Sequence, residues 1–195
     1  MTIMRKDIMR SLIVIVASTI VLGLIYPAVM VLFGQLVFPS QANGSLITRN
    51  GKTVGSKLAA QSFNGPRYFH ERPSAVSYNA DGTSFGNLGP NSKALRTLVQ
   101  TRIAKIMALE GPYNPGLSVK DIPVDAVTAS ASGIDPDISK AYAYLQAPRI
   151  AAVRHLSLAT VRRLINSHVD GRALGFLGEP GVNVLELNLA LDQEH

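Results

Sequence analysis

The uncharged, apolar stretch from Ser11 to Phe38 constrains the fold more than any other feature of the sequence. A helix needs about 20 apolar residues to cross a hydrocarbon core of roughly 30 Å, so this stretch can span a membrane even when tilted. A cleaved signal peptide would carry an apolar region only about half as long. A buried helix of a soluble protein would need a polar face, which this stretch lacks. We therefore predict one transmembrane helix over residues 11–38.

Charges on the two sides of this stretch predict its orientation. Three basic residues stand within the first ten positions, whereas the next positive charge after the stretch is Arg49. The positive-inside rule then predicts a cytoplasmic N-terminal tail over residues 1–10 and a soluble, extracytoplasmic domain over residues 39–195. The basic residues of the tail are Arg5, Lys6 and Arg10.

A proline and several small residues lie inside the predicted span. Pro27 has no N–H to donate, so it should kink the helix near its middle. Ala17, Ser18 and Gly23 form a candidate face for close packing against another membrane helix. A lone anchor with incidental small residues explains the same pattern, and the sequence leaves both interpretations open.

Composition excludes several classes of function. With 47% hydrophobic and 16% charged residues, the chain is typical of a folded protein. Its net charge of +6 is spread thinly, without a basic run interleaved with aromatic residues, so we expect no nucleic acid partner. The sequence has no cysteine, which excludes disulfides, thiolate metal sites and a cysteine nucleophile. The four histidines lack metal-ligand spacing and no catalytic motif is present, so we expect neither a metal cofactor nor catalytic residues.

The remainder of the chain predicts a single α+β domain, with strands at both ends and helices between them. The pair Asn50-Gly51 between two short β-prone runs is a strong hairpin signal. The C-terminal leucines alternate with other residues, as in a half-buried strand. The expected elements are a hairpin over 46–54, an ordered loop region over 63–90, helices over 91–110, 135–156 (disturbed at Pro148) and 157–169, an extended segment over 123–130 and a strand over 182–191.

A first candidate site is the segment Tyr68–Ser74, which combines aromatic and cationic side chains before a turn. Tyr68, Phe69 and Arg72 are its candidate interface residues. The same composition also fits a packed loop in which Arg72 donates hydrogen bonds to carbonyl groups, and the sequence does not decide between the two.

A second candidate site lies in the segment Thr128–Pro136, where small hydroxyl side chains and a glycine precede an expected helix N-terminus. Free backbone N–H groups and the helix dipole at such a place can receive an anion. A capped helix with a solvated polar face explains the segment equally well. On the expected helix, Gln146 and Arg149 stand three positions apart and therefore share one face. The candidate anion-site or interface residues are Ser130, Ser132, Gly133 and Asp135.

Taken together, these motifs resemble the C subunit of the Kdp-type bacterial potassium-transporting ATPase over nearly the whole chain. Several long motifs in the same order make the resemblance specific. They are the N-terminal span, Tyr68–Ser74, Gly86–Pro90, Thr128–Pro136, Gln146-Ala147-Pro148-Arg149 and Gly175–Asn188.

The resemblance implies an accessory, non-catalytic subunit of a complex that imports potassium at the expense of ATP across the bacterial inner membrane. Its partners would be membrane lipid, a channel-like subunit and a P-type ATPase subunit. The family is described as a catalytic chaperone that raises the affinity of the ATPase subunit for ATP through a Gln-x-x-Arg motif. By this resemblance, Gln146 would bond the ribose or base of the nucleotide and Arg149 a phosphate.

The predicted orientation conflicts with direct nucleotide contact, because an extracytoplasmic domain cannot reach cytoplasmic ATP. A second hypothesis therefore places the domain over the outer mouth of the channel-like subunit, where it stabilises assembly or influences potassium access. The two candidate sites would then hold interface or access-path residues. Residue chemistry without the resemblance leaves a third hypothesis, an anchored binding module for small anions.

Overall fold

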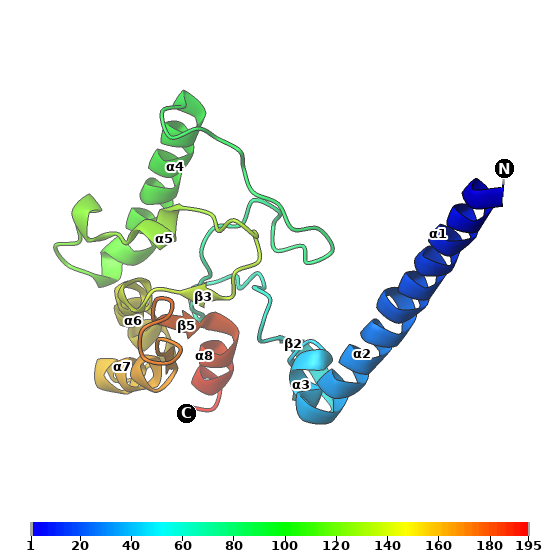
Figure 1. Ribbon diagram of the computed structural model, residues 1–195. Helices are drawn as coiled ribbons and strands as arrows, with labels where there is room; N and C mark the ends of the chain where they lie inside the picture. The colour runs from blue at the N-terminus through cyan, green and yellow to red at the C-terminus, as the bar shows by residue number, and fades with distance from the viewer. Residues whose placement is uncertain (1, 195) are drawn as a thin grey trace. The chain divides into compact units, whose positions relative to one another are not determined.

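The computed structural model describes residues 2–194 and divides the chain into two compact units, Met1–Leu46 and Ile47–His195. The first unit is dominated by one apolar helix that is long enough to cross a membrane, from Met4 to Val37. It comprises α1 (Thr2–Ile20), the π-helical turn η1 (Val21–Ile25) and α2 (Tyr26–Val37), followed by the short α3 (Pro39–Ala42) (Figure 1). No side chain of the most apolar part of this helix is buried within the chain.

The π turn explains how the helix continues through Pro27. In a regular α-helix the proline ring would clash with the carbonyl group four residues earlier, at Gly23. Here the turn is wider, and the Tyr26 N–H donates to the carbonyl of Val21, five residues back. The disturbance that we predicted at Pro27 is therefore located in the turn that precedes it, in η1.

Next along the chain is the hairpin of β1 (Leu46–Arg49) and β2 (Lys52–Ser56), all but the first residue of which belongs to the second unit. Both residues of its turn have positive φ, 51° at Asn50 and 76° at Gly51, as a two-residue hairpin turn that matches the strand twist requires. The hairpin predicted from this pair is confirmed. The chain then runs without helix or strand to the start of α4 (Lys93–Glu110).

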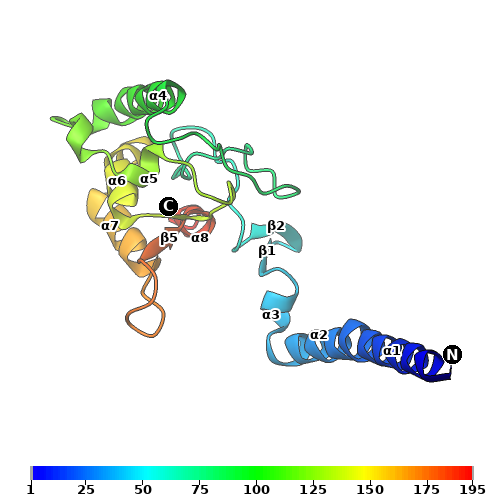
Figure 2. The same cartoon turned by 45° about the horizontal axis from the view of Figure 1, so that its top comes forward.

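The core forms around α6 (Lys140–Arg154), which packs with α7 (Leu158–Ser167) and α8 (Val184–Leu191) beside a small antiparallel sheet (Figures 1 and 2). The sheet has the strand order β3-β5-β4, and Val182 of its central strand pairs with Ile138 on one side and Val169 on the other. The α+β class predicted from the sequence is confirmed. The sheet strands are β3 (Asp137–Ile138), β4 (Val169–Asp170) and β5 (Gly181–Asn183); the short helices are η2 (Gly111–Tyr113), η3 (Val119–Asp121) and α5 (Val124–Val127).

Side-chain caps fix where the helices begin. Ser92 accepts a hydrogen bond from the Leu95 N–H and Ser157 accepts one from the Thr160 N–H, so the predicted starts of α4 and α7 are confirmed. The predicted start of the central helix at Asp135-Pro136 is wrong. Residues 137–138 pair with β5 instead, and Ser139 caps α6 by accepting from the Tyr142 N–H. The helix then continues through Pro148.

Two further predictions of local structure are wrong. Residues 124–127 form the helical turn α5 within the segment that we expected to be extended. The C-terminal leucines lie in a helix, because the Asn183 side chain caps it by accepting from the Glu186 N–H. Within α8 the fully buried positions Val184, Leu187 and Leu191 follow helical spacing, so the same letters that alternate as a strand also form a helical stripe.

Candidate functional site

The segment around Phe69 lies outside the helices and strands, and two side-chain amides pair with its backbone in place of neighbouring strands. Asn188 on α8 accepts from the Phe69 N–H at 2.8 Å and donates to the Phe69 carbonyl at 2.9 Å. Gln146 on α6 accepts from the His70 N–H at 2.7 Å and donates to its carbonyl at 3.1 Å. Buried backbone groups need such partners, so both helices are required to hold this segment.

Arg149 lies one turn further along α6 and is fully buried. Its Nε donates to the Glu110 carboxylate at the end of α4 at 2.8 Å, and its Nη2 donates to the Gln146 side-chain oxygen at 2.9 Å. The remaining guanidinium nitrogen, Nη1, donates to the carbonyls of Pro66 and Tyr68. We call Glu110, Gln146, Arg149 and Asn188 the Arg149 cluster; it ties α4, α6, α8 and the Phe69 segment together.

A second arginine covers the edge of the same segment. The guanidinium of Arg154 stacks on the Tyr68 ring at 4.9 Å from the centroid and donates to the Arg67 carbonyl at 2.7 Å. It also pairs with Asp192 at 2.7 Å. Tyr68 is therefore half-buried against the domain, beside Phe63, and the neighbouring Phe69 is fully buried.

Two residues named for nucleotide binding, Gln146 and Arg149, are thus brought together, but in the interior. Both side chains have 0% of their surface exposed, and their polar atoms are occupied by Glu110, by each other and by the backbone of residues 66–70. In this arrangement neither can touch a nucleotide. Contact with ATP stays a prediction of the family resemblance, and it would require the Arg149 cluster to open.

The second candidate segment packs against the first through Arg72 and Ser74. Arg72 pairs with Asp135 at 2.8 Å, and the Ser74 hydroxyl donates to the Gly133 carbonyl at 2.5 Å. Gly133 has a φ of 74°, and a Cβ there would lie 2.8 Å from the Ser84 carbonyl oxygen. Only glycine fits this close approach.

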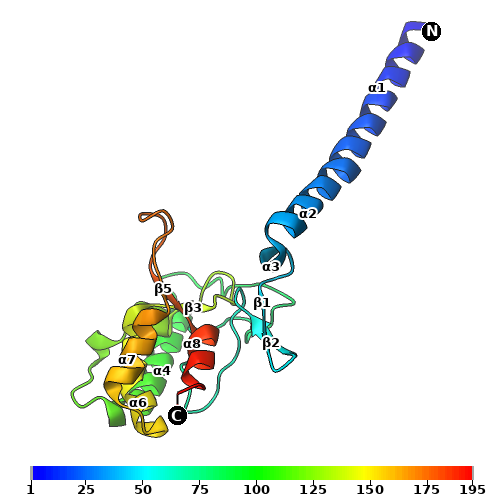
Figure 3. The ribbon, with the colours of Figure 1, turned by 90° about the horizontal axis from the view of Figure 1, so that it is seen from below.

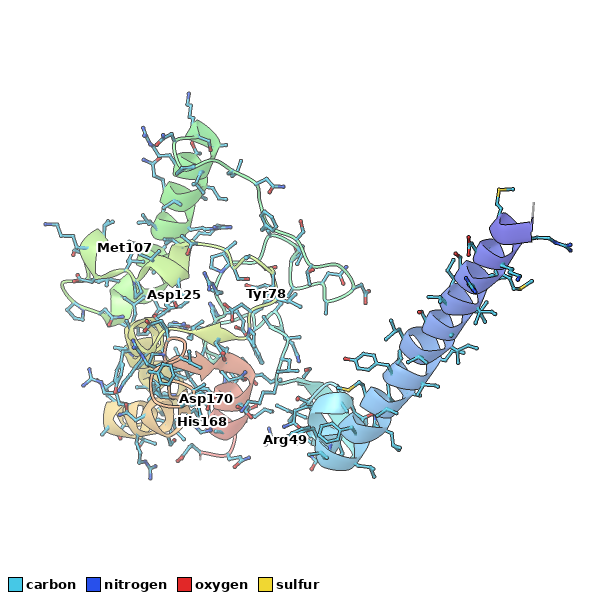
Figure 4. The ribbon with its side chains drawn as sticks, in the orientation of Figure 1. Arg49, Tyr78, Met107, Asp125, His168 and Asp170 are labelled. Atoms are coloured by element: carbon cyan, nitrogen blue, oxygen red, sulfur yellow. The ribbon has the colours of Figure 1, made fainter. Side chains whose placement is uncertain are left out.

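The helix N-terminus that motivated an anion site at this segment is absent there, because α6 begins at Lys140, after β3. The Ser130 hydroxyl accepts from the Gly133 N–H, and the Ser132 hydroxyl accepts from the Ile134 N–H, so both stabilise their own turn. Asp125 on α5 holds the true helix start, accepting from the Ser139 N–H at 2.7 Å and from its hydroxyl at 2.9 Å (Figure 4). These hydroxyl side chains thus complete the turn, and the anion-site interpretation loses its basis.

Sequence reasoning missed Glu71, a buried carboxyl group next to the Phe69 segment. Only 5% of its surface is exposed, and neither carboxyl oxygen has a hydrogen-bond partner among the described residues. Burial raises the pKa of Glu71 to about 9; the nearby Gln61 backbone, outside hydrogen-bond geometry, lowers the pKa in part, and the charges of Asp135 and Asp137 raise it further. Glu71 is therefore protonated at neutral pH.

Glu110 and Asn188 were missed as well, although one signal points to Asn188. It stands within the apolar stripe of Val184, Leu187 and Leu191, where a polar residue needs a buried partner. Glu110 carries only a weak signal: an acidic residue in the last turn of a helix opposes the helix dipole. Among the described residues, no group of three His, Cys, Asp or Glu side chains could hold a metal ion.

The structure thus defines a class: a small α+β domain with a buried polar centre, on a chain with one candidate membrane span. Comparison with known proteins makes the class specific. The family model described as KdpC, the c chain of K+-transporting ATPases, matches residues 8–193, and the chain belongs to this family.

Two relatives illustrate the similarity. The potassium-transporting ATPase KdpC subunit of Burkholderia mallei is 52% identical over 191 residues, which cover 96% of this chain and 96% of the relative. That of Acidobacterium capsulatum is 50% identical over 182 residues, covering 92% of this chain and 94% of the relative.

Arg149→Ala should destabilise the domain by about 3–5 kcal/mol, because it leaves the Glu110 carboxylate buried without its counter-charge. Urea unfolding of the full chain in detergent, followed by tyrosine fluorescence, measures the change. The matched control is Arg96→Ala, at an exposed position on α4, which should shift stability by less than about 0.5 kcal/mol. Equal, small effects of both substitutions would contradict a structural role for Arg149.

Glu71→Gln should change how stability depends on pH. The folded state keeps a proton on Glu71 up to about pH 9, whereas the unfolded chain releases it near pH 4.5. The contribution of Glu71 to the free energy of unfolding is therefore complete below pH 4.5. It is lost as pH rises towards 9, at up to about 1.4 kcal/mol per pH unit. The variant lacks this loss, so the free energy of unfolding of the variant minus that of the native chain should grow from pH 5 to pH 8. Urea unfolding at several pH values measures this difference, and a difference that does not change with pH would rule out a protonated Glu71.

Proposed function

We propose that the chain is an accessory subunit of an ATP-driven potassium import complex, which it helps to assemble and stabilise. Membership of the c-chain family supports this proposal. The single structural observation that favours an assembly role is the Arg149 cluster: Gln146 and Arg149, the pair that the resemblance assigns to ATP, are fully buried. Their chemistry is used to hold the domain together.

The proposal places the N-terminus in the cytoplasm and the second unit on the extracytoplasmic side of the inner membrane. The support is the charge asymmetry around the span, with three basic residues before it and none after it until Arg49. A domain on that side acts on the outer surface of a channel-like or ATPase subunit. Nucleotide affinity could then change only indirectly, through the assembled complex.

The apolar helix supplies the anchor, and its lack of buried side chains supports contact with lipid and with membrane helices of other subunits. The π turn at Val21–Ile25 leaves backbone groups with altered pairing near the middle of the span. Neighbouring helices commonly cover such places. We therefore place part of the contact with partner subunits within the membrane.

Assembly is tested by omission. The other subunits of the complex are expressed with and without this chain and purified in mild detergent. We expect the complex to fall apart and potassium-limited growth to fail without the chain, and the native chain to restore both. A complex that stays intact and active without the chain would refute an accessory role in assembly.

Sidedness is tested with single cysteines, since the native sequence has none. Lys120→Cys, at an exposed position of the second unit, should react with a membrane-impermeant thiol reagent in intact cells with a permeabilised outer membrane. The matched control Lys6→Cys should react only after lysis. The reverse pattern would put the domain in the cytoplasm and reopen direct contact with ATP.

A further inference from the structure

The connection between β4 and β5 is a hairpin that protrudes from the second unit, as two views show (Figures 2 and 3). Every residue from 170 to 180 is exposed. Three large apolar side chains crowd its end: Leu174 is 84% exposed, Phe176 68% and Leu177 49%. We call residues 172–179 the hairpin tip.

The hairpin tip has a defined shape without support from the core. The backbone of Ala173 and Leu177 pairs in both directions at 2.9 Å, and Leu174 and Gly175 both adopt positive φ. At its base Arg172 donates to both carboxylate oxygens of Glu179, at 3.0 and 2.9 Å. Positive φ at the non-glycine residue Leu174 is uncommon, so the turn holds one specific conformation.

We propose that the hairpin tip is a docking element that inserts Leu174, Phe176 and Leu177 into an apolar pocket on the extracytoplasmic surface of another subunit of the same membrane complex. The inference rests on the proposed function, because it needs a partner anchored in the same membrane. Preorganisation lowers the entropy lost on binding, and an aromatic side chain is a common interface anchor.

The size of the patch indicates a tethered partner. Three such side chains offer on the order of 400 Å² of apolar surface, against about 800 Å² per partner in a standard stable interface. Alone, this patch is too small to hold two proteins together. A span that fixes the chain in the membrane next to its partner makes the second contact intramolecular, with an effective concentration of about millimolar, so a small patch is sufficient.

The charges of the hairpin tip and of the whole chain argue against two other apolar partners, a lipid bilayer and a second copy of this chain. Between Asp170 and Gly181 the only charged residues are Arg172 and Glu179, which neutralise each other. Elements that lie on bilayers usually add Lys or Arg to reach anionic headgroups, and none is free here. A second copy of this chain would bring together two chains of net charge +6 through the same small patch.

Photo-crosslinking in the assembled complex identifies what the hairpin tip contacts. A benzophenone amino acid is placed at Phe176, and the matched control is Val124, which is 73% exposed on α5 of the same domain. We expect a protein adduct with another subunit from position 176 and at least about fivefold less from position 124. Adducts with lipid alone, with a second copy of this chain, or with nothing would each overturn the proposal.

The rate at which the chain dissociates from the purified complex tests how much the hairpin tip contributes to binding. Leu174→Ser combined with Phe176→Ser should make the chain dissociate from the purified complex about tenfold faster, the effect of losing one or two anchors, whereas Val124→Ser should not. Arg172→Glu should also weaken retention, and the exchange of Arg172→Glu with Glu179→Arg should restore it. If the native chain stays bound and all variants dissociate at the same rate, docking by the hairpin tip is refuted while the proposed function stands. If the native chain itself is never retained in the complex, both the docking role and the proposed function fail.

Discussion

The buried ion pair between Arg149 and Glu110 is the interaction on which the rest of the domain depends. A charge without water needs a counter-charge and hydrogen bonds in every direction. Arg149 finds them in α4, in α6 and in the carbonyls of an otherwise unsupported segment. Each of these parts thus has a fixed place, because moving any of them would leave the guanidinium unsatisfied.

The amides of Gln146 and Asn188 extend this arrangement to the segment that carries the family motif Tyr68–Ser74. They pair with the backbone of residues 69–70, so this segment enters the core without a neighbouring strand, and the Phe69 side chain is fully buried. A motif that looks like a binding site in the sequence is therefore an internal framework. The hairpin tip, for which we propose a docking role, is a separate and fully exposed part of the domain.

The sequence predicted those features that depend on local chemistry. The apolar helix, the Asn50-Gly51 turn and the serine caps at Ser92 and Ser157 follow from rules that act within a few residues. The start of α6 and the fate of the C-terminal leucines depend on distant partners: residues 137–138 pair with β5, and α8 needs a core to cover its stripe. The burial of Gln146 and Arg149 likewise depends on residues far along the chain, which no local pattern reveals.

The contact between Phe69 and Asn188 joins residues 119 positions apart. Closing such a loop delays folding until both ends are present. The apolar helix leaves the ribosome before the second unit, whereas α8 (Val184–Leu191) follows every other helix and strand of that unit. The two parts of the chain must therefore acquire structure in succession: the apolar helix can form while the second unit is still being made, and the second unit cannot complete its core before Asn188 has been added. A chain that stops short of Asn188 would thus hold its helix but leave the Phe69 backbone without its partner.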